Sequence, residues 1–282
     1  MSMRPVAPVE LSKKTTRNPI APPPKIAWLA LPQLVIDEEY QRGLSIRSLR
    51  LIETMVSSWD WNHFKPLSVA PREDGTYEIV DGQHTAIAAA THGSIENLPC
   101  LVLSAETQAG RASAFVAINT NRLTLTPFAL YRARVSAGEP EAVAVSEAIE
   151  AQGVTLIEAA RSGEPGEHEY AVGTCASVGS LLQIARKGGK ARLKRVFKIA
   201  MDGEVQMMRA GMLKALAEIV ADRATAPADT DLSTAIARAG ANTLYERAAE
   251  RGRMGTAPGN TAIGAWVAVI LQEVARNRRD AA

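Results

Sequence analysis

The sequence predicts an α+β (mixed α/β) N-terminal module followed by an all-helical C-terminal domain. Two observations lead to this prediction. Short β-branched strands alternate with helices up to Pro127, and two of these strands flank an Asp74-Gly75 turn of the kind that hairpins favour. Beyond Pro127 the strand signals nearly vanish, and helix-length amphipathic stretches follow one another.

The first 127 residues divide into an arm and a module. Residues 1–25 hold six prolines and little hydrophobic periodicity, so we expect a disordered arm. Residues 26–127 form the module, and Ser45 is a predicted helix N-cap. The predicted strands cover 26–31, 34–36, 66–70, 76–80 and 101–103, and the predicted helices cover 45–58, 83–91 and 105–118.

The helical domain is predicted over residues 128–282. Glycines follow several of its apolar stretches and mark helix ends, as Gly138 and Gly153 do. The predicted helices cover 128–137, 139–152, 178–185, 193–201, 205–221, 232–249 and 261–276.

The most informative motif joins a strand to a helix between Tyr77 and Ala90. The predicted strand ends at Val80, and Gly82 permits a sharp turn before an alanine-rich helix. Four polar residues crowd this junction: Asp81, Gln83, His84 and Thr85. The first N–H groups of a helix lack internal partners and carry the positive end of its dipole. The junction therefore suits an anion or a phosphate.

The same residues carry a family resemblance. The motif resembles the signature of the ParB/sulfiredoxin-like fold, in particular the "DGQHR" group of ParB-like nuclease-domain proteins. Tyr40-Gln41-Arg42 before the first helix, Pro66–Val69, Leu98–Val102 and Asn119–Leu123 fit in order, so the resemblance covers roughly residues 26 to 127. It implies a DNA-associated protein in a plasmid, prophage or chromosome-maintenance setting.

The resemblance also implies which residues hold phosphate. In the resembling families an arginine of the early segment faces the motif loop, which makes Arg42 a candidate ligand beside Gly82, Gln83 and Thr85. The segment with Asn119, Asn121 and Arg122 returns to the same pocket in that family. The implied ligand is a nucleotide such as CTP or ATP with Mg²⁺, and the cofactor itself stays open.

Two departures from the family pattern matter. Sulfiredoxin-like enzymes place a nucleophilic cysteine where this chain has Gln83, which excludes cysteine sulfinate reduction. ParB proteins place an arginine-rich motif here, whereas this chain has no arginine between Asp81 and Ala90. Triphosphate binding would then depend on Arg42, Arg122 and backbone amides.

A basic segment lies within the helical domain. Between Tyr170 and Met201 the chain has no acidic residue, although its net charge is only +2. Such a cluster is typical of contacts to a nucleic-acid backbone, and the alternative is a solvated helix face. The predicted nucleic-acid ligands of this segment, 186–198, are Arg186, Lys187, Lys190, Arg192, Lys194, Arg195 and Lys198.

Three functions remain open. The first is a DNA-associated protein whose module binds a nucleotide or a nucleic-acid phosphate at Asp81–Thr85. The second is a Mg-dependent phosphodiesterase or nucleotide hydrolase with His84 as acid/base and Asp81 recruiting the metal. The third is a non-catalytic interaction module. Whether the chain is an enzyme and whether it forms a homodimer are open.

Composition narrows the setting. Cys100 and Cys175 are far apart and lack metal-type spacing, so we expect buried, reduced thiols and no preformed metal site. No apolar run approaches the roughly 18 residues of a membrane span, and no signal-peptide stretch opens the sequence. We therefore predict a cytoplasmic protein with no membrane partner.

Overall fold

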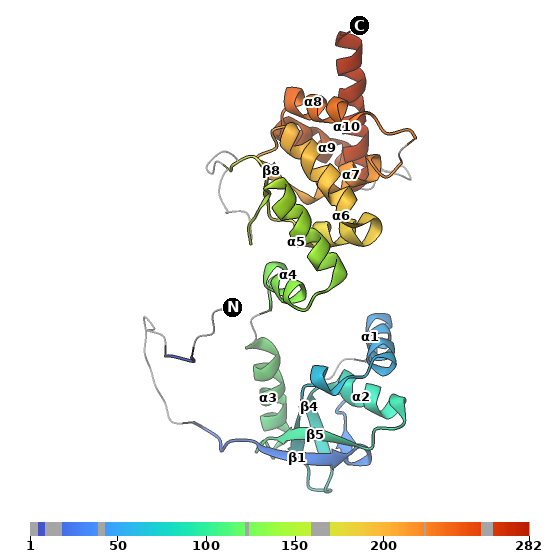
Figure 1. Cartoon of the computed structure of the whole chain (residues 1–282). Coiled ribbons are helices and arrows are strands. Elements are labelled where there is room, and N and C mark those ends of the chain that lie inside the picture. The colour runs from blue at the N-terminus through green and yellow to red at the C-terminus, as the bar shows by residue number, and fades with distance from the viewer. Residues whose placement is uncertain are drawn as a thin grey trace. The chain divides into compact units, whose positions relative to one another are not determined.

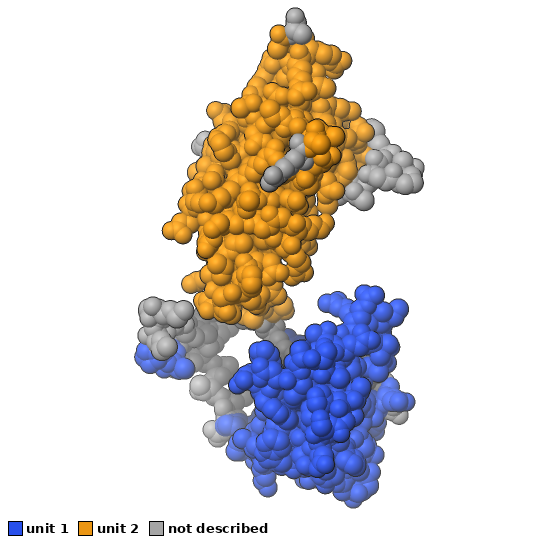
Figure 2. Space-filling model, turned by 45° about the vertical axis from the view of Figure 1, so that its right-hand side comes forward, with its two compact units in different colours: residues 1–123 blue, residues 124–282 orange. Residues whose placement is uncertain are grey.

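The computed structural model describes residues 5–8, 19–38, 43–121, 124–158, 170–222, 224–254 and 262–281. The chain forms two compact units, residues 1–123 and residues 124–282, which Figure 2 colours separately. The first unit mixes strands and helices and the second is mainly helical, so the predicted α+β class is confirmed. Most of the arm predicted over 1–25 lies outside the described residues, and its last residue, Lys25, opens the first strand.

Unit 1 is built around a five-stranded mixed sheet with the order β1-β5-β3-β4-β2. β1 and β5 are antiparallel, as are β3 and β4, whereas β5 is parallel to β3 and β4 to β2. Each strand is short and rich in apolar residues. The strands are β1 (Lys25–Ala30), β2 (Leu34–Val35), β3 (Leu67–Pro71), β4 (Tyr77–Asp81) and β5 (Asn97–Val102).

Three helices accompany this sheet. In Figure 1, α3 (Gln108–Thr120) stands to one side of β4, and α2 (Gln83–His92) and α1 (Ile46–Ser57) stand to the other. The N-cap of α1 is Ser45, as predicted, because its hydroxyl accepts a hydrogen bond from the backbone of Ser48. The strands and α2 share a small hydrophobic core, which includes the fully buried side chains of Leu67, Val69, Ala89, Leu98 and Cys100. Two 3₁₀ turns, Leu31–Gln33 and Trp61–His63, complete the described elements.

Unit 2 contains a larger core shared by its helices. Within it, α6 lies against α5, α7 and α8, while α10 packs on α7, α8 and α9. The helices are α4 (Pro127–Ser136), α5 (Pro140–Gln152), α6 (Val178–Asp202), α7 (Ala210–Ile219), α8 (Asp229–Ala239), α9 (Ala241–Met254) and α10 (Ala262–Asp280). Within the described residues, no helix combines the length and apolar character needed to cross a membrane.

The prediction that this part is all-helical is wrong in one respect. Three two-residue strands form a parallel sheet with the order β6-β7-β8: Thr155–Leu156, Thr174–Cys175 and Met207–Met208. Strands this short cannot be predicted from the sequence, because the alternation of apolar and polar residues that marks a strand is recognised only over four or more residues. The helix predicted from residue 205 accordingly begins later, at Ala210.

Two glycines separate helices in unit 2. The predicted stretches 178–185 and 193–201 are helical on either side of a kink, because Gly189 has the non-helical angles φ 62° and ψ −170°, and the label α6 covers both. The stretch 232–249 is two helices, because Gly240, at φ 76°, interrupts it. In both cases a glycine has a backbone angle that other residues rarely adopt. The sequence pattern predicted the break at Gly189 and missed the break at Gly240.

Candidate functional site

The turn between β4 and α2 is shaped by Gly82. This residue is the N-cap of α2 and has φ 103° and ψ 18°, in the left-handed region. A Cβ atom at this position would lie 2.9 Å from Cγ of Leu67, a fully buried residue of β3. Only glycine therefore lets the chain leave the sheet and start the helix at this point.

The start of α2 opens onto a cavity of about 490 Å³ within unit 1. The motif residues Asp81, Gln83, His84 and Thr85 are among the residues that line it. Because the first N–H groups of a helix have no acceptor within the helix, they give the cavity hydrogen-bond donors and a positive dipole end. The cavity therefore has a floor that suits a phosphate or another anion.

Two other helices supply the walls of the cavity. α1 contributes Leu51 and Met55, four residues apart on one helix face, and α3 contributes Phe115 and Asn119. Three of these four side chains are apolar. The cavity thus combines the N-terminus of a helix with apolar side chains, and its volume lies in the size range of small-molecule sites.

The two predicted catalytic residues, Asp81 and His84, both line this cavity, but they differ in their interactions. The carboxylate of Asp81 accepts a hydrogen bond from Nζ of Lys65 at 2.8 Å, and only 19% of its side chain is exposed. Lys65, which the sequence analysis did not single out, therefore balances the charge of Asp81. His84 is half-buried and, within the described residues, has no hydrogen-bond or ion-pair partner, so its ring is available to a ligand.

The remaining predicted phosphate ligands divide into three groups. Asn119 lies in the cavity, where its amide donates to the backbone oxygen of Phe115 at 2.8 Å. Asn121 is the exposed C-cap of α3 and is not among the residues that line the cavity. Arg42 and Arg122, the two predicted cationic ligands, lie outside the described residues.

Among the described residues that line the cavity, Asp81 supplies the single carboxylate. Among the described residues no group of three His, Cys, Asp or Glu side chains is arranged to hold a metal ion. Both cysteines are buried and free, and burial raises the pKa of each thiol to about 11. Neither thiol is therefore available as a thiolate nucleophile near neutral pH.

Comparison with known proteins assigns the chain to a family. The family model described as "Family of unknown function (DUF6551)" matches residues 35–252, which is more than half of the sequence and extends from β2 in unit 1 to α9 in unit 2. The chain belongs to the DUF6551 family. None of the curated proteins matches it.

Solved structures similar to this DUF6551 protein include two of the chromosome-partitioning protein ParB from Caulobacter crescentus. The C-terminally truncated ParB complexed with CTP-gamma-S is 16% identical, with a TM-score of 0.38, over 62% of this chain and 99% of that one. The form complexed to the centromeric parS site is 15% identical, with a TM-score of 0.28, over 76% of this chain and 92% of that one. Such low TM-scores establish neither a shared ligand nor a shared mechanism.

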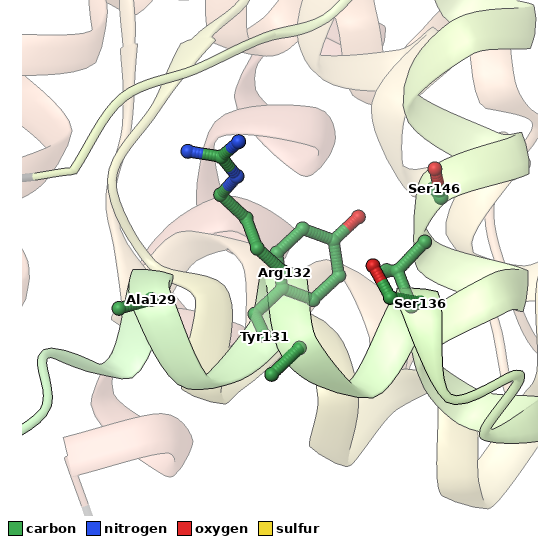
Figure 3. Close-up of a pocket in the computed structure, with 7 residues that line it drawn as sticks. Ala129, Tyr131, Arg132, Ser136 and Ser146 are labelled. Atoms are coloured by element: carbon green, nitrogen blue, oxygen red, sulfur yellow. The ribbon is translucent and has the colours of Figure 1, made fainter. Parts of the chain in front are cut away.

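A second cavity of the DUF6551 protein, of about 510 Å³, lies between α4 and α5 in unit 2. Figure 3 shows the phenol of Tyr131 directed toward the side where Ser136 and Ser146 lie, while Arg132 extends away from them. Burial raises the pKa of the Tyr131 phenol, and a hydrogen bond with Ser146 partly opposes this effect. Sequence reasoning did not find this cavity, because its lining residues form no motif.

The predicted nucleic-acid ligands of the DUF6551 protein lie along α6. Four of the seven form ion pairs with acidic residues that lie outside the acid-free stretch. The pairs are Arg186 with Glu141, Lys190 with Glu147, Arg195 with Asp229 and Lys198 with Asp202. A polymer-binding surface over 186–198 stays a prediction, but much of its charge is balanced within the described part of the chain.

Proposed function

We propose that unit 1 is a ParB-like module that binds a nucleotide, or a phosphate of a nucleic acid, at the Asp81–Thr85 turn. The cavity above this turn carries the proposal. Its floor is the start of α2, where three successive backbone N–H groups follow Gly82, and its wall is formed by Leu51, Met55 and Phe115. A phosphate suits the floor, and a base or sugar suits the wall.

The motif resemblance supports the same ligand class. Asp81, Gly82, Gln83 and His84 match the "DGQH" part of the "DGQHR" signature, and Asn119 of the closing segment lies in the same cavity. Thr85 takes the place of the signature's arginine. The phosphate would then be held by backbone amides, the Thr85 hydroxyl and the His84 ring, with Arg42 and Arg122 as proposed cationic partners.

From the motif resemblance we also infer the biological role: the protein would act on nucleic acid in plasmid, prophage or chromosome maintenance. The hydrolase alternative needs Asp81 to recruit Mg²⁺. The Asp81 carboxylate is already paired with Lys65 at 2.8 Å, so a metal would have to compete with an ammonium group for it. We therefore favour binding over hydrolysis.

The experiment is a thermal-shift panel of CTP, ATP, GTP and UTP with Mg²⁺. A ligand that binds only the folded protein raises its stability by RT ln(1 + [L]/Kd), so a millimolar site registers at several-fold excess. We expect one nucleotide to raise Tm, and His84→Ala together with Thr85→Val to abolish the shift. His63→Ala is the matched control, because His63 is exposed and lies outside the cavity.

Other outcomes discriminate the alternatives. Release of inorganic phosphate from the bound nucleotide, lost in His84→Ala, would establish the hydrolase. If no nucleotide changed Tm but the protein bound duplex DNA in a salt-sensitive way, the ligand would be a backbone phosphate of DNA and not a free nucleotide. If neither nucleotides nor DNA bound, the result would favour the third function, a non-catalytic interaction module.

A further inference from the structure

The bend of α6 in unit 2 is built by two adjacent glycines. Gly189, at φ 62° and ψ −170°, has a backbone conformation that is essentially confined to glycine. Gly188 has a different role, since a Cβ atom there would lie 2.3 Å from Nε and 2.6 Å from Cζ of Arg192. One glycine bends the helix, and the other leaves room for the Arg192 guanidinium to lie against the bend.

The Arg192 guanidinium is one of several cations that converge beside this bend. Lys187 comes from the first half of α6, Arg192 from the second half and Lys214 from α7. Within the described residues none of these three has a hydrogen-bond or ion-pair partner. They differ in this respect from Arg186, Lys190, Arg195 and Lys198, whose charges are balanced by acidic side chains.

These three cations, together with the paired Arg186, line a cavity of about 380 Å³ between α6, α7 and the start of α10. Ile184, Ala217 and Ile263 give the cavity an apolar surface, and Gln183 adds an amide. Glu218 is the single acidic residue among the described residues of the lining, so cations outnumber acids there. Positive charge at an apolar cavity fits a compact anion with an apolar body better than a long polymer backbone, which needs cations spread along a surface.

We propose that this cavity binds a small organic phosphate, with the phosphate held by Lys187, Arg192 and Lys214 and the apolar part of the ligand against Ile184 and Ile263. The site is independent of the Asp81–Thr85 cavity, since its lining residues all belong to unit 2. Arg192 can offer a fork of N–H donors to phosphate oxygens, and the two lysines add charge.

Phenyl phosphate is the probe, because it joins one phosphate to one small apolar ring, and its binding is measured by calorimetry and hydrogen exchange. We expect protection of peptides that cover 183–192 and 214–221. We also expect at least tenfold weaker binding of inorganic phosphate, which lacks the apolar part. Arg192→Gln with Lys214→Gln should weaken phenyl phosphate at least tenfold, whereas Lys198→Gln, on the same helix but outside the cavity, should leave it unchanged.

Gly188→Ala tests the site without changing any charge. The added methyl group would displace the flexible end of Arg192 and leave the fold intact, so we expect several-fold weaker binding with an unchanged circular dichroism spectrum. The proposal would be overturned if the Gly188→Ala protein and the Arg192→Gln/Lys214→Gln protein bound phenyl phosphate as tightly as the wild type does. Protection of these peptides by a DNA duplex and not by phenyl phosphate would also overturn it, and would make the region a polymer-binding surface.

Hydrogen exchange also separates this proposal from the function proposed for unit 1. Protection over 183–192 without protection over 81–85 supports the α6–α7 site alone. The reverse pattern overturns this site and leaves the unit 1 proposal intact.

Discussion

The carboxylate of Glu78, in β4, lies 2.6 Å from Nε of Arg111, in α3. Glu78 is fully buried and only 11% of the Arg111 side chain is exposed. The short distance and the burial of both side chains make this a close, desolvated ion pair. The ion pair ties α3 to the strand that leads into the motif turn, and α3 in turn supplies Phe115 and Asn119 to the cavity.

Loss of Arg111 should therefore destabilise unit 1. Arg111→Met removes the charge but keeps the bulk, and it takes the 2.6 Å ion pair away from the buried carboxylate of Glu78, whose contact to Arg72 is longer at 3.4 Å. We expect a loss of about 3 kcal/mol, typical of a broken buried pair, measured by urea unfolding. Arg72→Met is the control, and it should cost under about 1 kcal/mol because Arg72 is more exposed.

The Glu78→Met/Arg111→Met double variant distinguishes charge from packing. Because both charges are removed together, most of the stability lost in Arg111→Met should return. A double variant as unstable as the single one would mean that packing of the arginine stem, and not the ion pair, holds α3 in place.

Gly82→Ala should destabilise the turn more than Gly93→Ala does. Both glycines have left-handed φ angles, 103° and 78°, so alanine costs about 1–2 kcal/mol at either one. At Gly82 the new Cβ would also meet Leu67 at 2.9 Å, whereas at Gly93 it would meet nothing within 4 Å. The difference between the two urea midpoints measures that contact, and equal midpoints would contradict it.

The sequence predicted the parts of unit 1 that have local causes. Ser45 marked a helix start through its capping hydroxyl, and Gly82 marked the turn that opens α2. Asn119 was placed beside the motif by the family resemblance, and it does line the cavity. The apolar wall was not predicted, because Leu51 and Met55 are ordinary residues of an amphipathic helix until the fold brings them to the motif.

Sequence reasoning does not reach pairings between distant segments. Arg195 lies in a stretch without acidic residues, yet Asp229 of α8 pairs with it at 2.8 Å. Lys65 was overlooked for the same reason, since its partner Asp81 lies sixteen residues away. Charge counted along a chain does not equal charge on the folded surface, because side chains pair across elements.

Tyr245→Phe should destabilise unit 2. The Tyr245 hydroxyl donates to the backbone oxygen of Met207 at 2.7 Å and accepts from the backbone N–H of Arg209 at 3.1 Å. It thereby ties β8 and the start of α7 to α9. Phenylalanine keeps the ring against Trp266, 4.9 Å away, but leaves both backbone groups without this partner. We expect a loss of about 1–3 kcal/mol by thermal or urea unfolding.

Tyr131→Phe is the matched control for this variant. Its hydroxyl bonds to one side chain, that of Ser146, and not to the backbone of two elements. We expect a loss of no more than about 1 kcal/mol. Equal losses in the two variants would show that the backbone contacts of Tyr245 add nothing to the stability of unit 2.

The two buried thiols should make stability fall at alkaline pH. Burial raises the pKa of Cys100 and of Cys175 from an ordinary 9.0 to about 11, so the folded state favours the neutral thiol. This contribution is fully present below pH 9, where the thiols are neutral in both states. It declines from pH 9 to about pH 11, because the unfolded thiols ionise first and draw the protein toward the unfolded state.

Urea unfolding at pH 8, 9 and 10 measures this decline. Two pKa units correspond to roughly 2–3 kcal/mol for each thiol by pH 11, of which about half is lost by pH 10. Tyrosines and lysines titrate in the same range, so the comparison is with a Cys100→Ala/Cys175→Ala protein. The unfolding free energy of the wild type should fall more steeply than that of the double variant, and parallel curves would contradict the assignment of this pH dependence to the thiols.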